Sequence, residues 1–158
     1  MVLKVFLFLL LSIVMSCSSI KKDIYQISSV GLIRKQDKTT AIEIDKKYED
    51  ALVGLSEFSH VIVCYWFHKN DTPDKRKILS VHPRGNSHNP LSGVFATRAP
   101  VRPNLIGISL CKILSIERNV IEIDTIDAFD GSPIIDLKPY IPVIDSVADA
   151  QVPEWVYK

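Results

Sequence analysis

The chain has 158 residues, enough for one domain and too few for more than two. Hydrophobic residues make up 47% of it and charged residues 23%, which supports a buried core and excludes a disordered chain. The formal net charge of +1 excludes a polycation, so any binding of nucleic acid depends on a local basic patch.

The N-terminus resembles a bacterial lipoprotein signal. An early lysine, an apolar run and a small residue precede Cys17 in order, and the apolar run is too short to span a bilayer comfortably. The pattern predicts that residues 1–16 are a cleaved signal peptide, that Cys17 carries a lipid anchor in the membrane, and that residues 17–23 form a short linker. Alternatively, translation starts at Met15 and the protein is cytoplasmic.

The first half of the remaining chain predicts three strands and one short helix. Residues 24–35 and 41–45 show strand patterning, and residues 48–55 are compatible with about two helical turns. Residues 61–67 are β-branched and aromatic throughout, which predicts a central strand that is buried on both faces. Residues 69–77 are polar, contain a proline and predict an exposed loop.

The second half adds further strands. We expect them at residues 78–82, 106–116, 120–129 and 134–142, with a turn at the "DGSP" sequence and a C-terminal tail over 143–158. The total is six or seven strands with little helix, and the spacing of the turns is typical of a barrel or a sandwich. The fold class expected is therefore mainly β.

Two cysteines follow Cys17, and neither belongs to a metal-binding pattern. Cys64 and Cys111 each lie inside an apolar run, and no C-x-x-C pair is present. We therefore expect two small buried thiols in strands and no metal site.

The segment from residue 82 to residue 104 is rich in proline and arginine. Four prolines restrict its backbone, and Arg84, Arg98 and Arg102 present guanidinium groups that suit carboxylate or phosphate. This predicts a pre-organised site for an anionic ligand. Alternatively, the segment is only a connection whose arginines pair with acidic residues elsewhere, namely Asp127, Asp130 or Asp136.

Two other stretches carry candidate functional groups. "DAFDGSP" places Asp127 and Asp130 beside a turn, where a carboxylate can accept hydrogen bonds from ribose hydroxyls or an amine. The alternative is a hairpin turn with no ligand. His68 follows the central strand, and a histidine there suits either a general base or a surface cap of the strand.

Taken together, four stretches closely resemble the TsaA-like (TrmO) family. They are "GLSEFSHVIVCYWFH", "HPRG", "GVFATRAPVRPNLIGISL" and "DAFDGSPIIDLKPYIP", and the resemblance covers residues 24–142 in the family's order. It implies a small β-barrel, S-adenosyl-L-methionine as cofactor and a homodimer that binds the cofactor near the subunit interface. It also implies methyl transfer from that cofactor to N6 of threonylcarbamoyl-adenosine beside the anticodon of tRNA.

The resemblance also implies which residues bind the cofactor. The matching positions are His68, Lys69, Arg98, Leu110, Asp130, Gly131, Ser132 and Pro133. The family pattern does not fix a catalytic base, and our candidates for it are His68 and Asp130. We expect Arg84 and Arg102 to face tRNA phosphate.

This sequence departs from the family in two places. The Pro-Arg-Gln patch that follows the first strand in many members is replaced by "KQDKTTAIEI", and the proline after "RPN" is Leu105. The expected export signal would also separate the chain from cytosolic S-adenosyl-L-methionine and tRNA. The alternative function is therefore a membrane-anchored binding module that retains the barrel for another anionic or nucleoside-like ligand.

Overall fold

The computed structural model describes residues 23–157. The expected signal peptide and Cys17 lie outside this range. No helix within these residues has the length and apolar character needed to cross a membrane.

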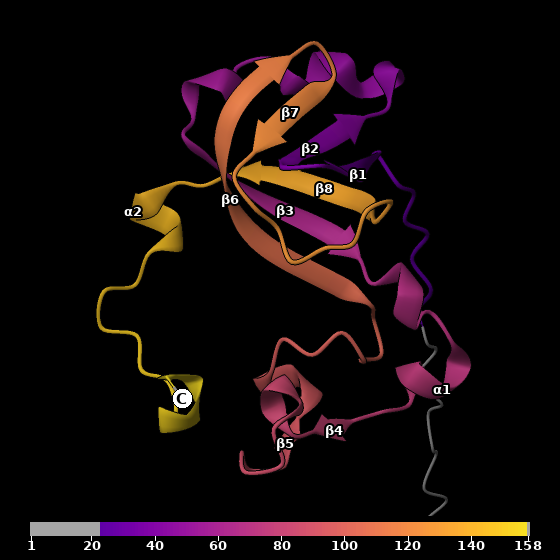
Figure 1. The fold of residues 1–158 in the computed structure, drawn as a ribbon, viewed down its shortest axis with the longest axis vertical. Coiled ribbons are helices and arrows are strands. Elements are labelled where there is room, and N and C mark those ends of the chain that lie inside the picture. The colour runs from indigo at the N-terminus through magenta and orange to yellow at the C-terminus, as the bar shows by residue number, and fades with distance from the viewer. Residues whose placement is uncertain (1–22, 158) are drawn as a thin grey trace, which may run out of the picture.

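Six antiparallel strands form a closed barrel (Figure 1). Around the barrel the order is β1-β2-β7-β6-β3-β8, so β8 closes the sheet against β1. The bounds are β1 Gly31–Gln36, β2 Thr39–Ile44, β3 His60–Trp66, β6 Ile106–Glu117, β7 Val120–Ile123 and β8 Pro133–Pro139. The expectation of a small, mainly β barrel is confirmed.

Short elements connect the barrel strands. They are the 3-10 helices η1 Lys46–Leu52, η2 Leu55–Glu57, η3 His68–Asn70, η4 Pro83–Gly85, η5 Val94–Ala96 and η6 Glu154–Tyr157, the α-helices α1 Pro73–Arg76 and α2 Pro142–Asp145, and the strands β4 Ser80–Val81 and β5 Ser92–Gly93. The helical turns expected at 48–55 are thus mostly a 3-10 helix that begins earlier.

The barrel core consists mainly of β-branched side chains. Ile33, Ile42, Val61 and Ile134 are completely buried, and they come from four different strands. Burying each such side chain stabilises the fold by about 1.5–3 kcal/mol. Because side chains alternate between the two faces of a strand, the positions of these buried residues specify which face of each strand turns toward the barrel interior.

Four expectations about strands were wrong. The strand expected over residues 120–129 ends at Ile123 as β7, and residues 124–129 form no strand. Strand β1 begins at Gly31 rather than at residue 24, and only Ser80–Val81 of the stretch 78–82 is a strand, paired with β5 outside the barrel. Strand β3 is central, between β6 and β8, but only one of its faces is buried. Its other face lies on the outside of the barrel, where no layer of helices covers it (Figure 1).

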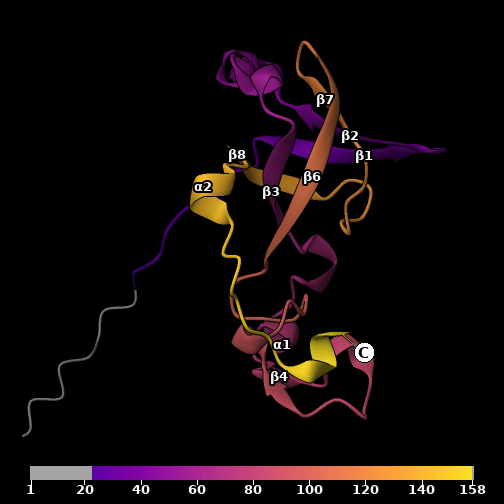
Figure 2. The ribbon, with the colours of Figure 1, turned by 90° about the vertical axis from the view of Figure 1, so that its left-hand side faces the viewer.

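Residues 71–104 form a lobe below the barrel, built around the two-stranded β4-β5 sheet (Figure 1). After α2 the C-terminal segment returns to this lobe, and its end lies beside the lobe in both views (Figure 2). Arg84 Nη2 donates a hydrogen bond to the carbonyl oxygen of Val156. The lobe is therefore in contact with the end of the described chain.

Candidate functional site

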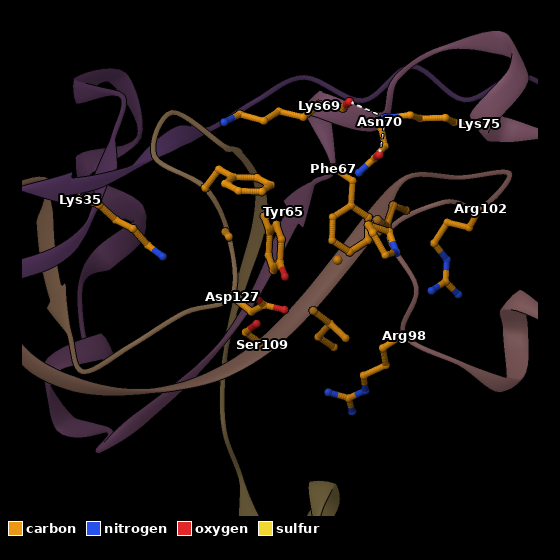
Figure 3. Close-up of a pocket in the computed structure, with 16 residues that line it drawn as sticks. Lys35, Tyr65, Phe67, Lys69, Asn70, Lys75, Arg98, Arg102, Ser109 and Asp127 are labelled. Atoms are coloured by element: carbon orange, nitrogen blue, oxygen red, sulfur yellow. Dashed lines mark hydrogen bonds between the residues drawn. The ribbon is translucent and has the colours of Figure 1, made fainter. Parts of the chain in front are cut away.

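A cavity of about 650 Å³ lies where the barrel meets the lobe. Strand β6 pairs with β7 only from Ile113 to Glu117, so its first half extends past β7. Segment 124–130 passes along this first half, and the backbone N–H of Lys112 donates to Oδ1 of Asp124 (2.9 Å). The cavity lies between this segment, β3, β6 and the arginine-rich part of the lobe (Figure 3).

The lining of the cavity is strongly cationic. Five basic side chains contribute to it, whereas Asp127 is the only carboxylate among the described residues that line it. The basic residues are Lys35, Lys69, Lys75, Arg98 and Arg102. Such a charge balance favours an anionic ligand, and a cavity of this size suits a ligand of nucleoside dimensions.

Arg98 is the basic residue best placed to meet a ligand. Its side chain is exposed, and within residues 23–157 it has no hydrogen-bond or ion-pair partner. Arg102 Nη1 instead makes long contacts with the carbonyl oxygens of Thr97 (3.4 Å) and Ala99 (3.5 Å). A guanidinium without a protein partner retains all its donors for carboxylate or phosphate.

Gly107 allows two aromatic rings to lie over strand β6. A Cβ atom at this position would lie 2.6 Å from Cζ of Tyr65 and 2.9 Å from Cζ of Phe67, closer than real Cβ contacts. The two rings meet edge to face, with centroids 5.4 Å apart. Both rings line the cavity, so the glycine shapes its apolar wall.

Tyr65, Ser109 and Asp127 form a polar group in the same wall, and Figure 3 shows their side chains converging. Burial raises the pKa of Tyr65 above its usual value, the Ser109 hydroxyl partly offsets this, and the charge of Asp127 raises the pKa further. The Tyr65 phenol therefore stays protonated at neutral pH and acts as a hydrogen-bond donor.

Segment 126–130 is anchored by its own alternating pattern. Ile126 and Ala128 are buried in the core, and this turns Asp127 and Phe129 toward the cavity. Lys35 holds both ends of the segment, because its Nζ donates to the carbonyl oxygen of Ile126 (2.8 Å) and its backbone N–H donates to Oδ1 of Asp130 (2.9 Å).

Phe129 faces a cation across the cavity. Lys69 Nζ lies 4.1 Å from the centroid of the Phe129 ring, within the range of a cation–π contact. Lys75 Nζ donates to Oδ1 of Asn70 (2.8 Å) and to the carbonyl oxygen of Lys69 (3.2 Å), which fixes the turn that carries Lys69. Aromatic faces and ammonium groups thus lie side by side in the site.

The turn after β3 is tied to the lobe by Arg76. Its Nε donates to Oδ1 of Asp71 (2.9 Å), and its Nη1 donates to the carbonyl oxygen of Pro103 (2.9 Å). Asp71 also accepts from Nε1 of Trp66 (2.9 Å), and the hydrogen bonds from Arg76 and Trp66 lower the pKa of Asp71. These bonds fix the separation between Lys69 and the arginine-rich segment.

The structure brings some of the predicted site residues to the cavity. Lys69, Arg98 and Arg102 line it, from the turn after β3 and from the lobe. His68 begins η3 one residue before Lys69 but is not part of the lining. Its Nδ1 is buried and has no hydrogen-bond partner within the described part of the chain.

The "DGSP" turn lies beside the cavity and closes the barrel. The backbone N–H of Gly131, at φ 73°, donates to the carbonyl oxygen of Ile33 (2.8 Å), and Ile33 N–H donates to the carbonyl oxygen of Ser132 (2.9 Å). Ser132 is buried and Pro133 pairs with Leu32. Asp130 through Pro133 therefore join β8 to β1 and do not line the cavity.

Leu110 and Arg84 lie further away. Leu110 is half exposed on the outer face of β6, opposite Ile62 of β3. Arg84 lies in η4, with φ 59°, and contacts the C-terminal segment. Neither residue lines the cavity.

Of the aspartates considered as partners for the arginines, two have other partners. Asp130 accepts from the backbone of Lys35, and Asp136 pairs with Lys138 (2.8 Å between Oδ2 and Nζ). The described residues contain no cluster of three or more side chains that could hold a metal ion.

Sequence reasoning did not single out Lys35, Tyr65 or Phe129 for the site. Lys35 lies where many family members carry the Pro-Arg-Gln patch, and here the chain makes a tight turn after it, with Asp37 at φ 52°. Asp127 is a candidate from its place beside the turn, but the family motifs do not include it among the cofactor-binding positions. The alternation of buried Ile126 and Ala128 with Asp127 and Phe129 was the available signal.

Comparison with known proteins assigns the family. Residues 18–146 match the tRNA-methyltransferase O N-terminal domain. A probable S-adenosyl-L-methionine-binding protein of Methanocaldococcus jannaschii is 48% identical over 121 residues, 77% of this chain and 96% of that protein. The human tRNA (adenine(37)-N6)-methyltransferase is 42% identical over 106 residues, 66% of this chain and 23% of that protein.

The fold agrees with the sequence match. The crystal structure of TrmO from Pseudomonas aeruginosa superimposes with a TM-score of 0.67 at 29% identity, over 86% of this chain and 63% of that chain. The chain thus spans less than two thirds of that TrmO structure. These matches confirm the resemblance found in the sequence, and the chain belongs to the family of the tRNA-methyltransferase O N-terminal domain.

Proposed function

We propose that this protein is an S-adenosyl-L-methionine-dependent tRNA methyltransferase that methylates N6 of threonylcarbamoyl-adenosine beside the anticodon. The observation that carries the proposal is the cavity of about 650 Å³, in which guanidinium, ammonium and aromatic groups surround one carboxylate, in a chain of this family. Family membership supports tRNA methylation, and the position of the base in the tRNA is the more specific part of the proposal.

The residues present fit the cofactor. S-adenosyl-L-methionine carries an adenine ring, a carboxylate, an ammonium and a sulfonium, and when bound it supplies an activated methyl group. Arg98 and Lys69 suit the carboxylate, and the faces of Phe67 and Phe129 suit the adenine ring or a cation. The cavity volume lies within the range usual for ligands of this size.

In this proposal the protein positions the two reactants and excludes water from the site, and it forms no covalent bond with either of them. Tyr65, Phe67 and Gly107 form a packed wall that keeps water from one side of the site. Arg76 and Lys75 hold the turn that carries Lys69, so the binding groups are in place before the ligand arrives. Fixed geometry of this kind reduces the entropic cost of bringing two reactants together.

The remaining predicted cofactor residues support the site without lining the cavity. The backbone of Asp130 through Pro133 joins β8 to β1 beside the cavity, and we call this junction the seam of the barrel. His68 carries a buried Nδ1 that has no partner within residues 23–157, next to Lys69. Leu110, on the outer face of β6, would reach a cofactor only from a neighbouring subunit.

We expect a homodimer, and the outer face of β6 supports it. Ile106, Ile108 and Leu110 are 38%, 48% and 51% exposed, and they form an apolar stripe beside half-buried Ile62 of β3. Exposed apolar patches of this kind usually mark interaction sites. Sedimentation analysis of wild type and Leu110→Glu tests this, since the charge should convert a dimer to a monomer; a wild-type monomer contradicts the expectation.

Arg102 and Arg84 are proposed to bind tRNA phosphate. Arg102 lies at the cavity and Arg84 at the far end of the lobe, so the lobe would follow the tRNA backbone. Replacing Arg102 with alanine should weaken the binding of all tRNA sequences to a similar extent. It should also reduce the slope of log affinity against log salt concentration by about one, the value for one lost phosphate contact. An unchanged slope of log affinity against log salt contradicts this role.

The N-terminus supports a second candidate. A chain processed at Cys17 would be anchored in the membrane, away from tRNA, and the barrel would then be a binding module for another anionic or nucleoside-like ligand. A chain that begins at Met15 would be cytoplasmic and would meet its substrates. Cell fractionation with and without a signal peptidase II inhibitor separates the two, because only the anchored form changes size and remains with the membranes.

The experiment for the proposed activity measures binding and transfer together. Calorimetry should detect S-adenosyl-L-methionine binding to wild type and at least about tenfold weaker binding to Arg98→Ala, because a charged hydrogen bond is worth about 1.5–3 kcal/mol. Labelled cofactor should transfer its methyl group to tRNA that carries threonylcarbamoyl-adenosine, and not to tRNA without it. Failure of wild type both to bind and to transfer contradicts the proposal.

A further inference from the structure

Asp127 has an unusual position among the ionisable groups of the cavity. It is the only carboxylate among the described lining residues, and basic groups from four parts of the chain face the same space: Lys35 on β1, Lys69 on η3, Lys75 on α1 and Arg98 after η5. The side chain of Asp127 points into the cavity (Figure 3).

The proposed reaction needs one group that accepts a proton, because the acceptor nitrogen carries a hydrogen that must leave. The lysine and arginine side chains of the cavity are hydrogen-bond donors, not acceptors. Burial raises the pKa of Tyr65, so its phenol also enters the reaction protonated. Among the described lining residues this leaves the carboxylate of Asp127 as the acceptor.

The two earlier candidates for the base are less well placed. His68 does not line the cavity, although Lys69 next to it does. Asp130 accepts from the backbone N–H of Lys35 (2.9 Å), and it also lies outside the lining. A general base must come within hydrogen-bond reach of the proton that it removes, and Asp127 is the acidic residue, among the described ones, that lines the cavity where the substrate would bind.

We propose that Asp127 is the catalytic base, which accepts the N6 proton of the substrate nucleoside during methyl transfer. The inference rests on the proposed function. The N6 lone pair forms the new N–C bond, the bonding pair of the old C–S bond stays on sulfur, and the N–H pair stays on nitrogen as the proton moves to Asp127 Oδ. The carboxylic acid then returns its proton to water.

The surroundings of Asp127 suit this role. Buried Ile126 and Ala128 on either side hold its backbone, and Lys35 Nζ fixes the carbonyl oxygen of Ile126 (2.8 Å). Tyr65 and Ser109 supply hydroxyl groups beside the carboxylate (Figure 3). The two flanking anchors fix the backbone that carries the acceptor, which favours a proton transfer over hydrogen-bond distance.

Asp127→Asn in the full-length protein tests the inference, because it preserves shape and removes the basic oxygen. Calorimetry should give cofactor binding within about threefold of wild type, whereas single-turnover methyl transfer should slow about 10²–10⁴-fold. Asp127→Glu should recover part of the rate. Asp149→Asn, an exposed residue of the tail, is the matched control and should match wild type in both measurements.

The pH dependence separates a base from a residue that only positions the substrate. Without a base, hydroxide in solution must remove the proton, so the residual rate of Asp127→Asn should rise about tenfold for each pH unit from about pH 6.5 to 8.5, while wild type varies little. Lys35, Tyr65, Lys69 and Arg98 face the cavity in both proteins, so the comparison isolates Asp127.

The outcomes are distinct. A wild-type rate in Asp127→Asn, or a slow rate with the flat pH profile of wild type, overturns the assignment of Asp127 and leaves the proposed function intact. A loss of cofactor affinity of more than about tenfold with an unchanged maximal rate makes Asp127 a binding residue and also overturns it. Absence of transfer by wild type overturns the proposed function, and this inference with it.

Discussion

The backbone N–H of Lys35 donates a hydrogen bond to Oδ1 of Asp130 at 2.9 Å, although 95 residues separate them in the sequence. This bond joins the end of the first barrel strand to the turn before the last one. It lies beside the bond from Gly131 to Ile33, so the seam of the barrel and the wall of the cavity depend on the same turn.

Removing the Asp130 acceptor should weaken this seam. Asp130→Ala leaves the Lys35 N–H without its protein partner and should lower the free energy of unfolding by about 1 kcal/mol. Asp130→Asn retains an oxygen at Oδ1 and should lose less. Urea denaturation measures both, and equal stability of the alanine variant and wild type contradicts the structural role.

Gly107→Ala should damage the cavity through its aromatic wall. The new methyl group would lie within 3 Å of both Tyr65 and Phe67, so the rings must move, at a cost of about 1–3 kcal/mol in stability. The affinity for the cofactor, measured by calorimetry, should fall as well, because both rings line the cavity. Gly93→Ala is the stability control, because its Cβ would meet only the Leu79 carbonyl at 3.9 Å; a Gly107→Ala protein as stable as this control contradicts the prediction.

The C-terminal segment should compete with tRNA for Arg84. Arg84 Nη2 donates to the carbonyl oxygen of Val156, so removal of residues 153–158 should remove this contact and strengthen tRNA binding several-fold. The gain should vanish in the truncated chain that also carries Arg84→Ala. Filter binding at two salt concentrations measures the effect, and weaker binding after truncation would argue that the tail itself contributes to tRNA contact.

Stability should fall at high pH because of Cys111. Burial raises the pKa of Cys111 from 9.0 to about 11, so the folded state holds the thiol proton more tightly than the unfolded state. This contribution is complete below pH 9 and is lost as the pH rises toward 11, to a limit of about 3 kcal/mol. Cys111→Ala should flatten the decline between pH 9 and 11; parallel curves for the two proteins exclude the effect.

The sequence predicted the barrel well because each strand carries its own local pattern. Ile33, Ile42 and Ile121 are fully buried, whereas the residues on either side of each are partly or fully exposed, as the two-residue period requires. The pattern of residues 61–67 was misleading, since β-branched residues occur on both faces of β3 while only one face is covered. Whether an outer face is covered depends on tertiary packing, which a single strand does not encode.

The candidate site was only partly predictable. Lys69 and Arg98 were found through family motifs, and both line the cavity. Lys35 and Tyr65 come from strands whose local sequence is typical of any barrel, so their role arises from the register of β1 and β3. Asp127 and Asp130 lie three residues apart, and the burial of Ile126 and Ala128 together with the hydrogen bond from Lys35 N–H to Asp130 determines that Asp127 faces the cavity.

The most direct test of the account is nucleoside mass spectrometry of tRNA from cells with and without this gene. We predict that threonylcarbamoyl-adenosine beside the anticodon carries an added methyl group on N6 only when the protein is present, and that Arg98→Ala abolishes most of this product. Identical nucleoside profiles in the two strains, with the protein confirmed to be expressed, would contradict the account.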